Sequence, residues 1–189
     1  MTGIDLVVKV GGSLLKSPAD LDRVLEAIAT ASRNSRLLVV PGGGPFADAV
    51  RVVGKELQLS DDAAHWMAIL AMDQYAHVLA ERLKGSAVIE DPRAAGMVLK
   101  AGNIPVLALS RWMRAADPLP HSWDVTSDSI AAWVAGEVGA PHLVLIKPAG
   151  AAGDDLVDAY FPQALPADVV ARVVTVDQVD EALNHLSTD

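Results

Sequence analysis

The sequence predicts an α/β protein in which βαβ units surround a mostly parallel sheet. Short apolar runs alternate with stretches of helical periodicity, which is the pattern of strands joined by helices. Hydrophobic residues make up 51% of the 189 residues and aromatic residues only 4%, so aliphatic side chains supply the core. Strands that are covered by helices on both faces have this composition. We expect one domain over residues 1–189, because a chain of this length buries about 70% of its unfolded surface.

Composition and charge limit the classes of partner and the kinds of site that we expect. The net charge is −9, which argues against nucleic acid as the main partner but leaves room for a local cationic pocket for a phosphorylated small molecule. Cysteine is absent and neither His121 nor His142 has a visible ligand partner, so we predict no metal site built from protein side chains. No signal-peptide pattern and no apolar run of about 18 residues occurs. We therefore expect a cytoplasmic protein that does not act at a membrane.

The first part of the chain is expected to contain strands and helices in regular alternation. Ser17 caps a helix whose first position is Pro18, and Ser60 caps a long helix. The apolar residues of this long helix recur at three- and four-residue spacing, which predicts one stripe facing the core. The expected order is strand 4–10, helix 17–32, strand 36–40, helix 46–57, helix 61–83, strand 86–89, helix 91–101 and strand 104–109.

The second part is less regular. Residues 110–123 hold two prolines and two tryptophans without a clear period, so we expect an ordered loop. A helix over 127–138 and a strand over 142–146 follow. The Gly- and Ala-rich segment 147–153 is expected to be the most mobile part of the chain. A strand over 173–176 and a helix over 177–186, capped by Asp177, end the pattern.

The first apolar run delivers a lysine and a Gly-Gly turn to its end. Lys9 lies near the end of the expected strand, Gly11 and Gly12 allow backbone N–H groups close to a ligand, and Ser13 adds a donor. Such a cationic corner suits a phosphate. Taken alone, the segment fits two interpretations equally well: a phosphate site, or an ordinary strand-to-turn junction with Lys9 in solvent.

A second glycine-rich turn follows the second strand. Gly42, Gly43 and Gly44 precede a helix, so their N–H groups and the helix N-terminus favour an anion. Ligands bind at the carboxyl ends of strands in open α/β sheets, which places both turns on one rim. Neither turn matches the Walker A pattern or the dinucleotide-binding pattern.

Two further charged residues complete the candidate site. Asp128 falls in the first turn of the expected helix 127–138, where a carboxylate is also favourable for purely structural reasons. Lys147 follows an apolar strand and could simply be solvated. Together, two lysines, two donor-rich turns and one carboxylate form the layout for phosphoryl transfer, which depends on positioning and charge stabilisation.

Three motifs in this order resemble the amino acid kinase superfamily, which includes acetylglutamate, aspartate, uridylate, isopentenyl phosphate and fosfomycin kinases. The resemblance covers residues 4–150 and implies a three-layer αβα sandwich with a mostly parallel central sheet. The motifs are Lys9-Val10-Gly11-Gly12-Ser13-Leu14, Pro41-Gly42-Gly43-Gly44 and Thr126-Ser127-Asp128-Ser129-Ile130-Ala131.

The resemblance implies an ATP-dependent kinase that uses Mg²⁺ with the nucleotide. By matching position, Lys9 and Lys147 would serve the transferring phosphoryl group and Asp128 would organise both lysines. The implied nucleotide contacts are Gly11, Gly12, Ser13, Lys147 and Gly150, and the implied border of the acceptor is Gly42, Gly43 and Gly44.

Segments 41–48, 64–75 and 123–128 also resemble a narrower branch of this superfamily, the aminomethylfuran phosphate kinases of methanofuran biosynthesis. Enzymes of that branch convert a furanylmethyl phosphate into its diphosphate. The resemblance therefore implies [aminomethylfuranyl]methyl phosphate as the acceptor, a phosphorylated small molecule.

Candidate acceptor residues follow from this branch and from helical spacing. Arg51 and His65 could meet a phosphate, Asp73 could meet an amine, and Trp123 could form a wall of the pocket. Each has an ordinary structural alternative: a partly buried histidine for His65, solvated or helix-paired charges for Arg51 and Asp73, and a core position for Trp123.

One competing function remains open. The superfamily carries an Asp-Gly turn after the strand that here ends in Lys147-Pro148-Ala149-Gly150. A non-catalytic nucleotide- or oxoanion-binding protein on the same fold is therefore the alternative. Superfamily members commonly pair through a helix, so we also expect a homo-oligomer, with the helix 61–83 as a candidate interface.

Overall fold

A parallel sheet forms the centre of the protein. The computed structural model describes residues 3–151 and 156–184, and within them six strands join in the order β3-β4-β2-β1-β5-β6. Adjacent strands all pair in parallel, which confirms the predicted α/β class. The strands are β1 (Leu6–Val10), β2 (Leu37–Pro41), β3 (Ser86–Ile89), β4 (Ile104–Leu107), β5 (His142–Lys147) and β6 (Val170–Thr175).

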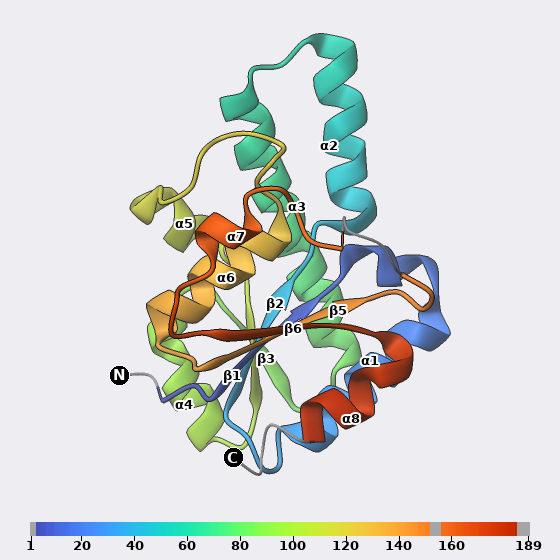
Figure 1. Cartoon of the computed structure of the whole chain (residues 1–189), viewed down its shortest axis with the longest axis vertical. Helices are drawn as coiled ribbons and strands as arrows, with labels where there is room; N and C mark the ends of the chain where they lie inside the picture. Colours follow the sequence, from blue (N-terminus) through green and yellow to red (C-terminus); the bar gives the residue numbers. More distant parts are fainter. Residues whose placement is uncertain (1–2, 152–155, 185–189) are drawn as a thin grey trace.

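Helices cover both faces of this sheet and give three layers (Figure 1). The longer helices are α1 (Pro18–Ala31), α2 (Gly44–Leu57), α3 (Asp61–Arg82) and α6 (Ser127–Val138). The shorter α-helices are α4 (Ala95–Lys100), α5 (Ser110–Ala116), α7 (Phe161–Ala164) and α8 (Val179–Asn184), and the 3-10 helices are η1 (Gly12–Lys16), η2 (Pro92–Ala94) and η3 (Val176–Gln178). None of the helices in the described ranges is long and apolar enough to cross a membrane.

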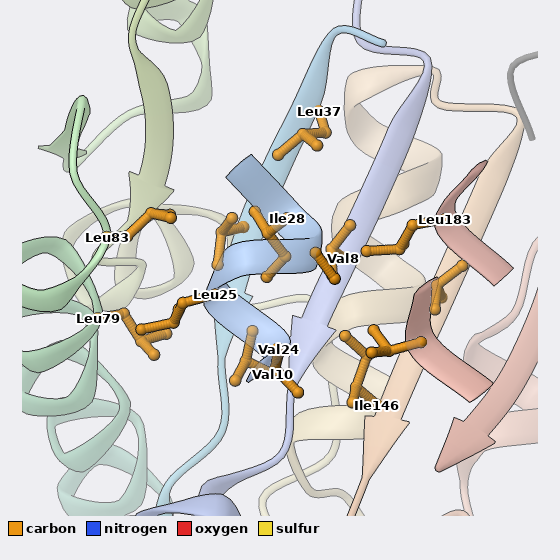
Figure 2. Close-up of a cluster of buried hydrophobic side chains, with 14 of the residues drawn as sticks. Val8, Val10, Val24, Leu25, Ile28, Leu37, Leu79, Leu83, Ile146 and Leu183 are labelled. Atoms are coloured by element: carbon orange, nitrogen blue, oxygen red, sulfur yellow. The ribbon is translucent and has the colours of Figure 1, made fainter. Parts of the chain in front are cut away.

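Alternation along β1 distributes its side chains between two hydrophobic clusters. Val8 and Val10 pack with α1 and α8, and Figure 2 shows Val8 near Ile28 and Leu183 and Val10 near Val24. Val7 points to the other face, where α5, α6 and α7 contribute the core. Since side chains alternate along a strand, Lys9 belongs to the same face as Val7. The strand pattern therefore already decides which helix layer Lys9 meets.

The long helix α3 does not have the single apolar stripe that its spacing predicts. Its Ser60 cap is confirmed, because the hydroxyl oxygen accepts the Ala63 N–H at 3.2 Å. However, Leu70 is 48% exposed, and buried positions spread around the helix. The reason is that α3 contacts both clusters: Met72 belongs to the cluster of α6 and Tyr75 to the cluster of α1. A helix that is buried on different sides along its length has no single stripe.

The prediction of a loop over 110–123 was wrong for the first half of this segment, which forms α5. Met113 is fully buried in the cluster of α6, and the Asp73 carboxylate accepts the Ser110 N–H at 3.1 Å where α5 begins. Both contacts come from distant parts of the chain, so the local sequence does not show them.

The other helix and strand boundaries differ less from the predicted ones. Residues 91–101 form η2 and then α4 instead of one helix, and α7 was not predicted. The last helical segment begins as η3, where Thr175 and Gln178 form a capping box in place of the predicted Asp177 cap. Residues 152–153 of the expected mobile loop and 185–186 of the last expected helix lie outside the described residues.

Candidate active site

Two lysines reach the same face of the sheet from neighbouring strands. Lys9 of β1 pairs in register with Leu145 of β5, so Lys147 lies two residues further along β5 on the same face. Leu145 and Val7 belong to the cluster beneath α6, which packs on both strands. Both ammonium groups therefore point toward α6 at the carboxyl ends of the strands, where ligands bind in open α/β sheets.

Asp128, the second residue of α6, lies between the two lysines. Its Oδ1 is 2.8 Å from Lys9 Nζ and its Oδ2 is 2.7 Å from Lys147 Nζ. Asp128 and Lys9 are only 4% and 3% exposed. One buried and one partly buried cation share one carboxylate, so the cluster carries an excess positive charge that an incoming phosphate can offset.

The titration behaviour of this cluster follows from burial and charge. Burial opposes ionisation of Asp128, but the ammonium groups of Lys9 and Lys147 outweigh it and hold its pKa below the ordinary value. Burial, followed by the neighbouring charge of Lys9, lowers the pKa of Lys147, although Asp128 opposes this. The carboxylate is therefore ionised at neutral pH and able to orient both lysines.

The first turn of α6 is held by a residue that the sequence did not single out. Thr126 precedes the helix, as predicted, but its hydroxyl does not cap it; the hydroxyl instead donates to Asp158 Oδ2 at 2.7 Å. The same oxygen accepts the N–H groups of Thr126 at 2.9 Å and Ser129 at 3.0 Å. Asp158 thus caps α6 from a remote part of the chain.

The two glycine turns touch one another. A Cβ built on Gly12 would lie 2.0 Å from the backbone nitrogen of Gly44, and one on Gly42 would lie 2.6 Å from the nitrogen of Gly12. Gly44 also has a positive φ of 55°. These glycines therefore allow two backbones to pack closely. The two turns therefore form one continuous wall.

This wall borders a cavity of about 230 Å³. Gly12, Ser13, Gly43 and Gly44 line one side of it, and the apolar residues Ile69, Met72, Val125 and Ile130 line other parts. The helices α2, α3 and α6 all have a residue of their first turn in the lining: Gly44, Asp61 and Ser127. The N-termini of α2 and α6 favour an anion here, whereas the α3 end carries a carboxylate.

The predicted residues Arg51 and Trp123 lie together in the cavity lining. The guanidinium carbon of Arg51 is 4.6 Å from the centre of the Trp123 ring, a cation–π distance. Arg51 also pairs with Asp48 at 3.0 Å, and Asp48 lies 3.7 Å from Lys16. All four side chains are in the lining, so this part of the cavity carries two cations for one carboxylate.

His65 lines another part of the cavity in an unusual state. It is 7% exposed, and its Nε2 atom has no hydrogen-bond partner among the described residues. The His121 ring stacks on it at 4.1 Å, and the nitrogens of His121 lie 2.7 Å from Asp62 and 2.8 Å from Asp117. Burial, with a smaller effect of His121, lowers the pKa of His65 to about 4, so His65 is neutral at pH 7. The hydrogen bond to Asp117 is the main cause that raises the pKa of His121.

The structure does not bring every predicted residue to the cavity. Asp73 is absent from the lining and accepts the Ser110 N–H at the start of α5. Gly150 lies in the turn after β5, also away from the lining, and the lining likewise does not include Lys9, Gly11, Gly42, Asp128 or Lys147. Lys16 and Asp61 line the cavity although they were not predicted as site residues. Their positions follow from the η1 turn and the α3 start, which show no chemical pattern in the sequence. Across the described residues, no group of three or more His, Cys, Asp or Glu side chains could hold a metal ion.

Comparisons with known proteins show the family of the chain. The model of the amino acid kinase family matches residues 6–149. The chain is 26% identical over 174 residues to a [5-(aminomethyl)furan-3-yl]methyl phosphate kinase of Methanocaldococcus jannaschii, covering 91% of this chain and 79% of that protein. It is 29% identical over 142 residues to a uridylate kinase of Methanothrix thermoacetophila, covering 74% of this chain and 60% of that protein.

Solved structures support the fold. A uridylate kinase from Archaeoglobus fulgidus superimposes with a TM-score of 0.72, covering 96% of both chains at 17% identity. A UMP kinase from Bacillus anthracis superimposes with a TM-score of 0.70, covering 97% of this chain and 91% of that one at 15% identity.

Proposed function

Because this chain belongs to the amino acid kinase family and is a phosphotransferase, we propose that it transfers a phosphoryl group from ATP to a phosphomonoester. The proposed acceptor is an [aminomethylfuranyl]methyl phosphate, and the product is its diphosphate in methanofuran-type cofactor biosynthesis. The arrangement of Asp128 between Lys9 and Lys147, beside a cavity lined by both glycine turns, is the observation that carries this proposal.

The two lysines would act on the group in transfer. Phosphoryl transfer spreads negative charge over the oxygens of the moving group, so catalysis depends on fixed positive charge. Lys9 and Lys147 are held 2.8 Å and 2.7 Å from the oxygens of Asp128, which fixes both ammonium groups before a ligand arrives. In this proposal the lysines stabilise the transferring group and Asp128 positions them.

The acceptor phosphate would lie against the glycine wall. The start of α2 and the side chains of Lys16 and Arg51 are positive features of the lining. Trp123 stacks on Arg51 and offers a flat apolar surface for a ring. Apolar side chains such as Ile69 and Met72 complete a cavity that suits a small aromatic body with a phosphate at one end.

Two further residues of the lining have the chemistry for an amine. Asp61 offers a carboxylate, and His65 offers an unpartnered ring nitrogen that stays neutral at pH 7. The name of the Methanocaldococcus relative includes an aminomethyl group. We therefore assign amine recognition to Asp61 and His65, and no longer to Asp73, whose carboxylate holds the start of α5. This differs from the phosphate contact predicted for His65, because its neutral ring lacks the charge that would favour a phosphate.

Nucleotide and metal binding are proposed at the first glycine turn, next to β5. Gly12 and Ser13 would hold nucleotide phosphates together with Lys147 and Gly150. The Gly11 N–H already donates to the Ile146 carbonyl at 3.1 Å, so Gly11 would hold the turn beside β5 and leave the phosphate contacts to the residues that follow it. ATP supplies the phosphoryl group, and Mg²⁺ would arrive on its phosphates, since this ion is commonly held by substrate phosphates and few protein groups.

We also propose that the chain acts as a single domain in the cytoplasm and as a homo-oligomer. The support for self-association is a set of exposed apolar side chains on α2 and α3: Val52, Leu57 and Leu70 are 56%, 68% and 48% exposed. Exposed apolar patches commonly mark interaction sites. Light scattering of the purified protein measures its mass in solution directly.

The test is ATP-dependent phosphorylation of a panel of small phosphomonoesters. The panel contains an aminomethylfuran phosphate, the same compound without the amine, and UMP. We expect turnover of the first compound, weaker turnover of the second, and loss of activity in Lys9→Ala with ATP binding retained. Lys55→Ala removes an exposed lysine of α2 outside the main cavity and serves as the control. Equal inactivity of wild type and Lys9→Ala, with ATP still bound, would instead support a non-catalytic nucleotide-binding protein.

A further inference from the structure

Asp158 holds the first turn of α6 more completely than any single cap within that helix could. Its Oδ2 accepts three hydrogen bonds, from the N–H and hydroxyl of Thr126 and from the N–H of Ser129. Its Oδ1 accepts the hydroxyl of Ser129. A helix cap usually satisfies one N–H through its own side chain. Here one carboxylate, half-buried and 29 residues away from Ser129, satisfies two N–H groups and two hydroxyls.

The segment that carries Asp158 is itself fastened at a second point. The Tyr160 N–H donates to the Asp124 carbonyl at 3.1 Å, and the Phe161 N–H donates to the Asp158 carbonyl at 3.1 Å. Phe161 is buried in the hydrophobic cluster beneath α6. The start of α7 and the start of α6 are thus joined by backbone bonds, side-chain bonds and packing. This junction gives the Asp158 carboxylate a defined position from which to hold α6.

Asp128 lies inside the first turn of α6, whose ends are hydrogen-bonded to Asp158. Thr126 and Ser129 flank it in the sequence, and both are fixed by the same carboxylate. The Asp128 side chain reaches the two lysines on β1 and β5, and the charge of Asp158 also acts on Lys147. A rotation or opening of the turn would therefore move Asp128 relative to both lysines. Thr126 also lines the acceptor cavity, so the same movement would alter that wall.

We propose that Asp158 is a positioning residue that fixes Asp128 between Lys9 and Lys147 by holding the first turn of α6. Its negative charge also complements the N-terminus of α6, which an uncharged residue of similar shape would do less well. The effect on turnover rests on the proposed phosphoryl transfer, whereas the effect on the arrangement of the two lysines does not.

The first measurement is independent of activity. Acetic anhydride at low dose modifies lysines in wild type, Asp158→Ala and Asp158→Asn, and mass spectrometry gives the rate at each lysine relative to the exposed Lys55. In wild type we expect Lys9, which is buried and paired, to react about tenfold or more slowly than Lys55, and Lys147, which is paired but partly exposed, to be protected less. In Asp158→Ala this protection falls several-fold, and in Asp158→Asn, which keeps an oxygen acceptor but lacks the charge, it falls less.

A matched control removes a different capping carboxylate. Asp91 accepts the Arg93 N–H at 2.9 Å at the start of η2 and is not in the cavity lining. Asp91→Ala is expected to leave the protection of Lys9 and Lys147 unchanged. If Asp158→Ala does not fold, Asp158→Asn decides the question. A folded Asp158 variant whose lysines react at the wild-type rate overturns the proposal.

The second measurement separates positioning from general stability. We expect Asp158→Ala to lower kcat per folded molecule by about 10²-fold, with the KM for the acceptor changed far less, because small misplacements of catalytic groups have effects of this size. Asp158→Glu, which keeps the charge, is expected to recover part of kcat. Wild-type kcat in a folded Asp158→Ala variant contradicts the inference. If wild type phosphorylates none of the acceptors, the proposed function fails, and the lysine modification pattern still decides the role of Asp158.

Discussion

Replacing Asp128 by asparagine is predicted to destabilise the protein strongly, because a buried and a partly buried ammonium group would lose the carboxylate that they share. Asp128 and Lys9 are 4% and 3% exposed, and the Lys147 side chain is 14% exposed. Breaking a buried ion pair by removing one partner typically costs about 3–5 kcal/mol, since an uncompensated charge remains in the interior. The partial exposure of Lys147 lets water offset some of this. We therefore expect a loss of about 3 kcal/mol for Asp128→Asn.

The chain contains a matched surface control for this substitution. Asp48 also lies near two cations, Arg51 at 3.0 Å and Lys16 at 3.7 Å, but its side chain is 51% exposed. Surface ion pairs contribute about 0–1 kcal/mol. Urea unfolding followed by circular dichroism should give a loss below about 1 kcal/mol for Asp48→Asn. At this chain length the Asp128→Asn loss corresponds to a fall in Tm of about 6–12 °C.

The pH dependence of the same variant gives an independent check. The pKa of Asp128 is lowered in the folded state, so its contribution is present above its unfolded pKa and is lost as the pH falls through the folded pKa. The unfolding free energy of Asp128→Asn should therefore lack this acid-dependent contribution. The unpaired lysines lose their charge more easily in the folded protein, so the variant should regain stability as the pH rises above neutrality. Equal, small losses for Asp128→Asn and Asp48→Asn, with no recovery at high pH, would refute the reasoning.

Three further predictions concern the cavity. Burial lowers the pKa of His65 from its ordinary value of 6.5 to about 4, so wild type should lose up to about 2 kcal/mol of stability as the pH falls from 6.5 to 4, and His65→Gln should lose less over this range in urea titrations; parallel curves would contradict this. Gly12→Ala should destabilise by at least about 2 kcal/mol because its Cβ would meet a backbone atom at 2.0 Å, whereas Gly54→Ala, with open space in a helix, should stabilise by about 0.5–1 kcal/mol; equal thermal shifts would count against the close packing of the turns. Trp123→Ala should raise the acceptor KM about tenfold through loss of the ring contact, and Arg51→Lys should raise it less; an unchanged KM in both would remove them from acceptor binding.

Much of the site was predictable because strands carry their information locally. Lys9 and Lys147 each end an apolar run, and alternation places each on a definite face of its strand. The motifs around Gly11, Gly42 and Asp128 pointed to the right family, and the family match confirms this. The direct contact between the two glycine turns was not predictable, because it depends on how closely two backbones approach after the sheet has formed.

The acceptor side was predicted less well, for a physical reason. Helical spacing places Asp73 on the same face as His65, but it does not show that Ser110 takes up the Asp73 carboxylate. Conversely, Lys16 and Asp61 reach the cavity because η1 and α3 begin at its edge. The packing of helices against one another decides such contacts, and that packing joins residues far apart in the chain.

The region around Lys9 separates what the local sequence predicts from what depends on the tertiary structure. The sequence by itself determined the parallel α/β class, the strand that presents Lys9 and the family to which the chain belongs, because short apolar runs and local turn chemistry suffice for these. Only the tertiary structure decided that Asp128 bridges both lysines and that Asp158 holds the turn that carries it. Those contacts join β1, β5, α6 and the start of α7, and no local pattern encodes a distance between segments that meet only when the sheet and its helices have packed.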